Sequence, residues 1–289
     1  MAVPVQPAAP GQCADAPASI RWGLGLLPGA SVVAGSLVDR LRRFEGVLLA
    51  INVSLAFLLG KTVVEVGTFV LVSALILAAL YGFNDAWDAT GDRGNPRKNQ
   101  ELVAAHLALR KEVAIALVVI AVACVGLALA GSGWPAALAV VVILIVNGAY
   151  SGVFKGVPVV DVVWCGFWGA AYASIVTRDW SLLCVVGIMT AVCHVYQTLA
   201  DREVDVRNGI RTIAAGTPGA VPVTLLGLCM LLAVVLVAAL EIPGLAAISA
   251  FFPIVPYLTV PKFQVGWLLT KAYFGVLWLV VLGAYYATH

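Results

Sequence analysis

The chain has 289 residues, of which 62% are hydrophobic and only 11% are charged, and its mean hydropathy is +1.01. This composition excludes an ordinary soluble globular protein. A formal net charge of +2 gives no indication of nucleic-acid binding. We therefore expect an integral membrane protein that crosses the bilayer several times.

Residues 1–39 are expected to form a separate N-terminal region. The first part is rich in Ala, Pro and Gly, and an apolar stretch from Ile20 to Val38 is interrupted by Pro28. A cleaved signal peptide fits poorly, because no positively charged segment precedes an uninterrupted apolar run. We expect a flexible tail followed by an interfacial segment, with the membrane domain at residues 40–289.

The remaining chain contains nine apolar stretches of roughly spanning length. Turn-forming residues such as Pro243 and Gly244 separate them. The fold predicted is an all-α membrane protein with nine transmembrane helices in one bundle around a central cavity. The stretches are residues 44–60, 62–83, 112–131, 135–151, 158–177, 180–200, 218–240, 243–260 and 264–287.

An acidic motif follows the second stretch. Asn84, Asp88 and Asp92 lie in the pattern NDxxDxxxD, and Arg97 and Lys98 come shortly afterwards. Mg²⁺ prefers oxygen ligands and is typically held by one or two carboxylates together with substrate phosphate oxygens. The basic residues would then neutralise the phosphate charge that the metal does not. The motif therefore indicates a site for Mg²⁺ and phosphate.

A further polar segment ends the fourth stretch. It contains Tyr150, Ser151, Lys155, Pro158 and Asp161. Taken alone, it is explained by an interfacial Tyr beside a Lys whose ammonium reaches the lipid headgroups. The segment emerges on the same side as the acidic motifs, however. An ammonium there is placed to hold a leaving diphosphate, and a phenol to orient it.

A second acidic motif lies at the end of the sixth stretch, where Asp201 and Asp205 form a DxxxD followed by Arg207 and Arg211. Both motifs end a polar stripe with the same spacing of 3, 4 and 4, which predicts one face of a helix. Ionisable residues at membrane depth usually mark a substrate or ion path. The first stripe is Tyr81, Asn84, Asp88 and Asp92, and it recurs 113 residues later as His194, Gln197, Asp201 and Asp205.

Basic residues are distributed asymmetrically over the predicted loops, and an excess of Lys and Arg normally faces the cytoplasm. The opposite side holds only Lys61 and Arg178, and Lys271 falls inside a span. We expect a multi-pass protein of the cell (inner) membrane with the N-terminus and both motifs in the cytoplasm and the C-terminus outside. The cytoplasmic side holds 14 of the 17 basic residues: Arg21, Arg40, Arg42, Arg43, Arg93, Arg97, Lys98, Arg110, Lys111, Lys155, Arg202, Arg207, Arg211 and Lys262.

Together these residues resemble the UbiA superfamily of intramembrane prenyltransferases. The resemblance covers about residues 40–287 and includes the NDxxDxxxD motif, the DRxxD motif that begins at Asp201, and the YSxxxK motif that extends to Asp161. Arg40 with Gly46 is similar to the family's opening segment. Many members have Arg-Pro-Leu after the first motif, whereas this chain has Lys98-Asn99-Gln100-Glu101-Leu102, so the subfamily stays open.

The resemblance implies an isoprenyl diphosphate donor, one or two Mg²⁺ ions and an active site that opens to the cytoplasm. The implied metal ligands are Asn84, Asp88, Asp92, Asp201 and Asp205. The four aspartates with Tyr150 and Lys155 are the candidate catalytic residues. Diphosphate-binding candidates are Arg40, Arg97, Lys98, Lys155, Arg207 and Arg211.

The pocket for the acceptor or the prenyl chain is expected to include Tyr81, His194, Gln197 and Trp168. An allylic carbocation needs a dry, aromatic-lined cavity, although aromatic residues at helix ends also form lipid-facing belts. His194 is placed to position an acceptor or act as a base, or else to form a hydrogen bond between helices. Glu65 and Lys271 are charged residues inside predicted spans. Three roles stay open for them: an ion pair with each other, contact with the membrane interface, or a place in the cavity wall. Further candidate aromatics are Trp87, Tyr150, Trp164, Phe167, Tyr172 and Tyr196.

The leading hypothesis is a Mg²⁺-dependent membrane prenyltransferase that joins an isoprenyl chain to a lipophilic acceptor, aromatic or isoprenoid. Within the superfamily, an aromatic quinone precursor, a polyprenyl or carotenoid end, a tetrapyrrole acid and a phosphoribosyl group stay open as acceptors. A terpene cyclase is the first alternative, because the same ionisation without an acceptor allows the cation to close on its own chain. A cation-coupled transporter is an alternative of another class, but its charged groups would lie near the bilayer midplane.

Overall fold

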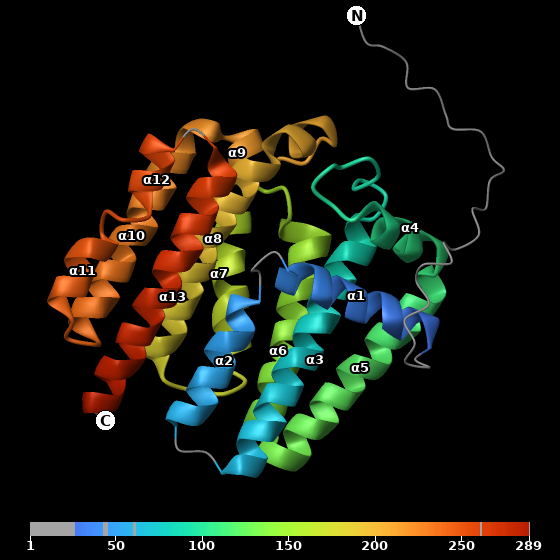
Figure 1. Ribbon diagram of the computed structural model, residues 1–289, viewed down its shortest axis with the longest axis horizontal. Coiled ribbons are helices and arrows are strands. Elements are labelled where there is room, and N and C mark those ends of the chain that lie inside the picture. Colours follow the sequence, from blue (N-terminus) through green and yellow to red (C-terminus); the bar gives the residue numbers. More distant parts are fainter. Residues whose placement is uncertain (1–26, 43–45, 60–61, 261, 289) are drawn as a thin grey trace, which may run out of the picture.

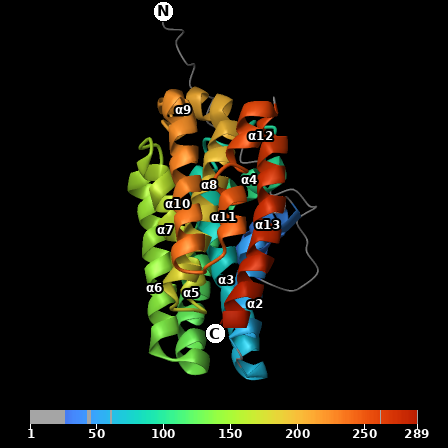
Figure 2. The same cartoon turned by 90° about the vertical axis from the view of Figure 1, so that its left-hand side faces the viewer.

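The computed structural model describes residues 27–42, 46–59, 62–260 and 262–288, and within these ranges the chain is helical without any β-strand. The helices pack side by side in an elongated bundle, with several long ones roughly parallel to each other (Figures 1 and 2). They are α1 (Pro28–Arg42), α2 (Val47–Leu58), α3 (Val63–Asp88), α4 (Gln100–Ala108), α5 (Arg110–Ser132), α6 (Trp134–Ala149), the π-helix η2 (Tyr150–Phe154), α7 (Val160–Ala173), α8 (Trp180–Arg207), α9 (Ile213–Gly216), the 3₁₀-helix η3 (Pro218–Ala220), α10 (Val221–Ala238), α11 (Pro243–Ser249), α12 (Ile254–Thr259) and α13 (Phe263–Thr288).

Within the ranges that the structure describes, six helices are long and apolar enough to cross a membrane, as in a multi-pass membrane protein. All nine predicted stretches are largely helical, but α2 has 12 residues and α7 has 14. At about 1.5 Å per residue, a helix of this length falls short of a hydrocarbon core roughly 30 Å thick. The prediction of nine spanning helices is therefore not confirmed. The six are Val63–Asp88, Arg110–Ser132, Trp134–Phe154, Trp180–Arg207, Pro218–Ala238 and Phe263–Ala287.

The predicted span at residues 243–260 is interrupted. Helix α11 ends at Ser249, and α12 begins at Ile254 after Pro253. Proline has no amide hydrogen to continue the helical hydrogen bonds, and its ring disfavours a helical conformation for the residue before it. The sequence pattern registered the apolar length of this segment but not the break.

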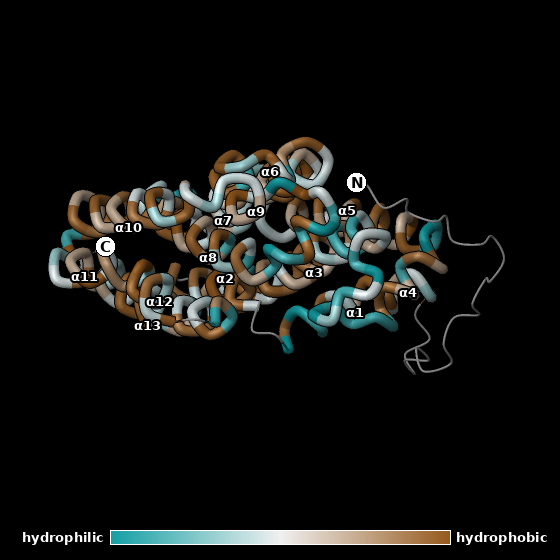
Figure 3. The backbone as a smooth tube through the Cα atoms, turned by 90° about the horizontal axis from the view of Figure 1, so that it is seen from above, coloured by the Kyte–Doolittle hydropathy of each residue, from teal (hydrophilic) through white to brown (hydrophobic). Residues whose placement is uncertain are grey.

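Helices α3 and α8 both run toward the same end of the bundle, which we call the motif end because the two acidic motifs lie there (Figure 1). The short helices α4 and α9 also lie at this end. Seen from above, hydrophilic residues gather over α1, α3 and α4, whereas α10 and α13 are mainly hydrophobic (Figure 3). The two acidic motifs, at the C-terminal ends of α3 and α8, therefore lie at one end of a bundle with several mainly hydrophobic helices.

The close packing of α7 on α8 is made possible by glycines. A Cβ atom added at Gly169 would lie 2.2 Å from Oγ1 of Thr190, and one added at Gly187 would lie 2.9 Å from the carbonyl oxygen of Gly166. Small residues allow the backbones of membrane helices to approach closely. This contact sets the position of Trp168 on α7 relative to the polar stripe of α8.

Helix α1 packs into the bundle and buries Val32 and Val33 together with residues of α3, α4 and α5. It is tied to α4 by a 2.9 Å hydrogen bond between Ser36 and His106. Burial lowers the pKa of His106, which favours the neutral imidazole for this bond. The predicted boundary at residues 39 and 40 falls inside α1, and the predicted flexible tail lies mostly outside the described residues.

Candidate active site

A cavity of about 670 Å³ opens at the motif end. Its mouth is lined by acidic and basic side chains, and its deeper walls are lined by apolar and aromatic ones. The mouth includes Asp88 and Asp92 from the first motif and Asp201 and Asp205 from the second. The structure therefore brings together the carboxylates that the sequence places 113 residues apart.

The first motif lies at the C-terminal end of α3. The helix ends at Asp88, and Asp92 lies in the following turn, where its amide donates a 3.0 Å hydrogen bond to the Asp88 carbonyl oxygen. The expectation that all four polar residues of this stripe lie on one helix is therefore wrong for Asp92, although that residue still faces the cavity. Lys98 Nζ lies 3.0 Å from Asp92 Oδ2, and Lys155 pairs with Asp88.

The second motif lies within a continuous helix, because α8 extends to Arg207. Arg97, from the loop after the first motif, pairs with Asp201. The hydroxyl of Thr212 donates a 2.9 Å hydrogen bond to Asp205 Oδ2. These contacts hold both carboxylates at the cavity wall.

The third predicted element forms a π-helical turn, η2, at the end of α6. The amide of Lys155 donates to the Tyr150 carbonyl, and Gly156 follows with a φ of 85°. A single π-turn inside or at the end of an α-helix is rare and is often found at functional sites. Here it directs Tyr150 and Lys155 to the cavity, where the ammonium meets Asp88.

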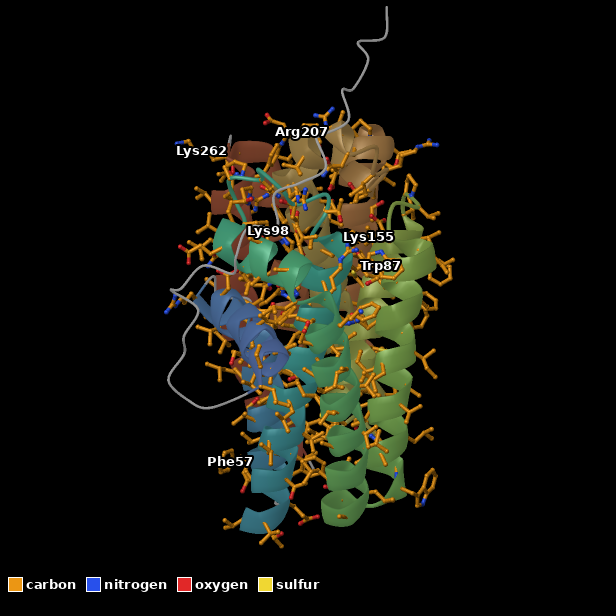
Figure 4. The ribbon with its side chains drawn as sticks, turned by 90° about the vertical axis from the view of Figure 1, so that its right-hand side faces the viewer. Phe57, Trp87, Lys98, Lys155, Arg207 and Lys262 are labelled. Carbon is orange, nitrogen blue, oxygen red and sulfur yellow. The ribbon has the colours of Figure 1, made fainter. Side chains whose placement is uncertain are left out.

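The predicted diphosphate-binding cations are placed differently from one another. Arg97 pairs with Asp201 but does not line the cavity, and Arg207 is exposed. In Figure 4, Arg207 and Lys262 point outward at the motif end, whereas Lys98 and Lys155 lie further inside the bundle. Of these predicted cations, Arg40, Lys98, Lys155 and Arg211 line the cavity.

Asp85 is a residue of this site for which the sequence analysis proposed no role. Arg40 Nη2 lies 2.6 Å from Asp85 Oδ1, and Lys98 Nζ lies 3.6 Å from the same oxygen. The guanidinium carbon of Arg40 also lies 5.1 Å from the centre of the Tyr81 ring. Asp85 thus positions two cations at the cavity wall. In the sequence, its place next to Asn84 within the first acidic motif was the feature that could have indicated this role.

The aromatic candidates separate into two groups. Trp87 and Tyr150 line the cavity with Tyr81 and Trp168, and the indole of Trp168 donates a 3.0 Å hydrogen bond to Asn147 Oδ1. The other candidates do not line it. Phe167 is exposed, Trp164 donates to the Val146 carbonyl, and Tyr172 and Tyr196 are fully buried with their hydroxyls bound to backbone oxygens.

His194 and Gln197 both line the cavity beneath the second motif. His194 is buried, and its Nε2 lies 3.7 Å from Oδ2 of the fully buried Asp161 without any hydrogen bond within the described residues. Asp161 also accepts a 3.2 Å hydrogen bond from the amide of Ile213. The carboxylate therefore holds the loop after α8 and lies beside the imidazole.

The two charged residues inside predicted spans, Glu65 and Lys271, lie in different surroundings. Glu65 forms a capping box with Thr62 at the start of α3, at the end of the bundle opposite the motifs. Lys271 lines the cavity, and its ammonium lies 3.9 Å from the centre of the Trp267 ring. Of the two, Lys271 belongs to the cavity and Glu65 does not line it.

The residues at the mouth fit a divalent cation that is shared with a substrate. Among the described residues, no three His, Cys, Asp or Glu side chains cluster closely enough to hold a metal by themselves. The oxygen Oδ1 of Asn84 is buried and accepts no hydrogen bond in the described part of the chain. An unsatisfied amide oxygen beside carboxylates is a suitable ligand for Mg²⁺, whose remaining ligands would be water and phosphate oxygens.

A model of the UbiA prenyltransferase family matches residues 46–286. The chain belongs to this family. Among curated relatives, a lycopene elongase/hydratase of Haloferax volcanii is 29% identical over 212 residues, which is 70% of this chain and 68% of that protein.

Solved UbiA structures share the fold. A UbiA homologue from Archaeoglobus fulgidus bound to DMAPP and Mg²⁺ matches with a TM-score of 0.62 and 16% identity, over 86% of this chain and 99% of the other. The same homologue bound to GPP and Mg²⁺ gives a TM-score of 0.61 and 17% identity over the same shares. At this identity the match establishes the architecture and does not by itself assign a substrate.

Proposed function

We propose that this UbiA-family protein transfers an isoprenyl group from a prenyl diphosphate to a lipophilic acceptor in a Mg²⁺-dependent reaction within the membrane. The observation that carries the proposal is the two-part cavity. Four aspartates and several cations surround its mouth, and its deeper walls are apolar and aromatic. A diphosphate suits the first part, and a hydrocarbon chain suits the second.

Asn84, Asp88, Asp92, Asp201 and Asp205 are the residues that would hold Mg²⁺. When bound, the metal would neutralise charge that develops on the departing diphosphate. The binding of DMAPP and GPP with Mg²⁺ by the Archaeoglobus homologue supports this assignment.

The ion pairs at the mouth suggest how the chain prepares for an anionic donor. Lys155 pairs with Asp88, Arg97 with Asp201, and Lys98 with Asp92. A diphosphate that enters with its counterion offers each cation a new anionic partner. Lys155 and Lys98 would then donate hydrogen bonds to diphosphate oxygens, with Tyr150 orienting the leaving group.

Ionisation breaks the bond between the allylic carbon and the diphosphate oxygen, and the electron pair leaves with the diphosphate. The cation that remains is protected by the dry walls of the cavity. Tyr81 and Trp168 face this space and lie 6.5 Å apart, centre to centre. Their π-faces are suited to stabilise positive charge, and His194 and Gln197 are placed to orient the acceptor.

The proposal is tested with purified full-length protein, radiolabelled C5, C10, C15 and C20 diphosphates and Mg²⁺, with and without a panel of lipophilic acceptors. The expected result is diphosphate release coupled to an alkylated acceptor, and its loss on chelation with EDTA. Cyclic product without an acceptor would favour a terpene cyclase. Absence of diphosphate release from every donor would contradict the proposal.

Two variants test the proposed metal ligands. Asp88→Ala and Asp201→Ala are each expected to lower turnover by about 10²–10³-fold, because each removes an electrostatic contact to the leaving group. Glu203→Ala is the matched control, since Glu203 is an exposed acid on α8 outside the cavity. Near-native activity of either aspartate variant would contradict the assignment.

A further inference from the structure

One cation of the cavity mouth, Arg40, comes from a helix outside the acidic motifs. It lies in the last turn of α1, which crosses α3 near the motif end (Figure 1). The side chain is buried and lines the cavity, and its Nη2 lies 2.6 Å from Asp85 Oδ1. The position of this guanidinium therefore depends on how α1 packs against the rest of the bundle.

The two ends of α1 are held by different contacts. At the N-terminal end, Gly29 lies so close to α5 that an added Cβ would be 2.1 Å from the carbonyl oxygen of Glu112. Toward the C-terminal end, Ser36 is fully buried, and its Oγ lies 2.9 Å from Nε2 of His106 on α4. Ser36 is four residues before Arg40, so both lie on one face of α1, about one turn apart. The hydrogen bond to α4 thus acts on the half of α1 that carries the guanidinium.

Helix α4 also supports the second cation that meets Asp85. The side chain of Gln100, the first residue of α4, donates a 2.7 Å hydrogen bond to the Asn95 carbonyl oxygen and accepts a 2.9 Å hydrogen bond from the Gly94 amide. These bonds hold the loop that carries Lys98, whose Nζ lies 3.6 Å from Asp85 Oδ1. One short helix thus holds both the loop that carries the lysine and the helix that carries the arginine.

His106 itself lies outside the cavity. Its side chain is buried, and together with Leu102 and Val103 of its own helix it lines a separate space of about 10 Å³. A buried histidine away from the substrate contributes only packing unless its hydrogen bond also determines where a binding group lies. Here the hydrogen bond joins the helix of a mouth cation to the helix that holds the mouth loop.

We infer that His106 is a positioning residue: its hydrogen bond to Ser36 holds α1, and with it Arg40, at the cavity mouth, where the donor's diphosphate binds. The inference rests on the proposed function, because it takes the anion at the mouth to be a diphosphate. Loss of the hydrogen bond leaves a fraction of the molecules with α1 displaced. The apparent affinity for the donor then falls in proportion to the fraction in which Arg40 stays in place.

The first test measures the affinity of the full chain, in lipid nanodiscs with Mg²⁺, for geranyl S-thiolodiphosphate, an analogue of GPP that resists ionisation. In calorimetry, His106→Leu is expected to weaken binding roughly 2- to 10-fold, as for the loss of one buried hydrogen bond. His106→Gln should bind like the native protein, because the glutamine amide reaches the place of Nε2 and restores the bond to Ser36. Ser36→Ala should match His106→Leu. Ser31→Ala on the same helix is the control, because Ser31 is only partly buried and lines neither cavity.

A second pair of variants separates positioning from stability. Arg40→Met is expected to weaken binding of the analogue about 10- to 100-fold, because it removes a hydrogen bond from a charged group. If His106 acts through Arg40, adding His106→Leu to Arg40→Met should cause no further loss, whereas a general loss of stability would lower affinity in both backgrounds. A loss that persists in full beside Arg40→Met, or that His106→Gln does not restore, would overturn the inference.

The position of α1 is tested without any ligand. Val33 on α1 is fully buried, and a Cβ added at Gly82 on α3 would lie 3.0 Å from its Cγ1. In a background without native cysteines, Val33→Cys should react with a thiol reagent roughly 2- to 10-fold faster when His106→Leu is present, and at the original rate when His106→Gln is present. Equal rates in all three proteins would overturn the inference. Faster labelling with His106→Leu, together with a native protein that does not bind the analogue, would contradict the proposed function alone.

Discussion

At Lys155, the contribution of the positive charge can be tested separately from that of side-chain packing. Its ammonium pairs with Asp88 at the cavity mouth, beside the place where charge would grow as the carbon–oxygen bond breaks. Lys155→Met is expected to lower kcat more than it raises KM, because a contact that strengthens in the transition state acts chiefly on the chemical step. Steady-state kinetics of the purified variant measure both.

Lys111→Met provides the comparison, since Lys111 is exposed at the start of α5 and lies outside the cavity. An unchanged kcat for Lys155→Met, with unchanged affinity for a non-hydrolysable diphosphate, would contradict a role in diphosphate binding and show that Lys155 is only an interfacial lysine.

Single residues also mark the limit of the sequence analysis. The spacing of Asp201 and Asp205 placed both on one face of α8, because helical periodicity is a local property. The same argument failed for Asp92, because the helix ended at Asp88 and a turn brought the carboxylate back. The contacts of Asp85 with Arg40 and of Asp161 with the loop after α8 join residues 45 and 52 positions apart. No local pattern encodes such a distance.

Among the elements, the contact between α7 and α8 is expected to be the most sensitive to added volume. Gly169→Ala would place a methyl group 2.2 Å from Thr190 Oγ1, so one helix must move. Overpacking of this kind costs about 1–3 kcal/mol, more than the 0.5–1 kcal/mol that alanine gains over glycine within a helix. The melting temperature in detergent should fall, and activity with it, as Trp168 shifts.

Gly227→Ala on α10 is the control for this substitution, because an added Cβ there meets no atom within 4 Å. It should leave the melting temperature unchanged or raise it. Equal melting temperatures for the two alanine variants would show that α7 and α8 do not require a glycine at their contact.

Helix lengths were the part of the fold that composition predicted least well. Apolar stretches predicted the helices α2, α3, α5, α6, α7, α8, α10 and α13 and the segment of α11 and α12, since hydrophobic runs report burial or lipid contact, but they did not include α4. They did not show that α2 and α7 stop after 12 and 14 residues, nor that Pro253 separates α11 from α12. Those ends depend on turns and on packing against neighbouring helices, which the apolar run does not record.

For the molecule as a whole, the orientation in the membrane stays a prediction. The distribution of loop cations predicts that the motif end faces the cytoplasm and that the opposite end faces outward. Asn99 is the N-cap of α4 at the motif end, Arg178 lies in the loop between α7 and α8 at the other end, and both are exposed. In a background without native cysteines, Asn99→Cys should resist a membrane-impermeant thiol reagent in intact cells, and Arg178→Cys should react.

Labelling of the residue at position 99 from the outer medium would reverse this topology. Permeabilised cells provide the control, because both cysteines should then react. In that case the prenyl diphosphate donor would have to reach the cavity from the outer face of the membrane.

The parallel course of α3 and α8 has a consequence for metal binding. A helix carries a partial negative charge of about half an elementary unit at its C-terminus. Both acidic motifs lie at such an end, so two helix dipoles add to the field of four carboxylates. This negative potential opposes the field of the paired cations Lys155, Lys98 and Arg97, and should attract a divalent ion even without substrate. Mg²⁺ alone should therefore raise the melting temperature, with about 1.4 kcal/mol more stability for each tenfold rise in concentration above Kd. EDTA should reverse this rise in melting temperature. A protein carrying both Asp88→Ala and Asp201→Ala should show no rise. A melting temperature of the native chain that does not change with Mg²⁺ would mean that the ion binds only together with the diphosphate.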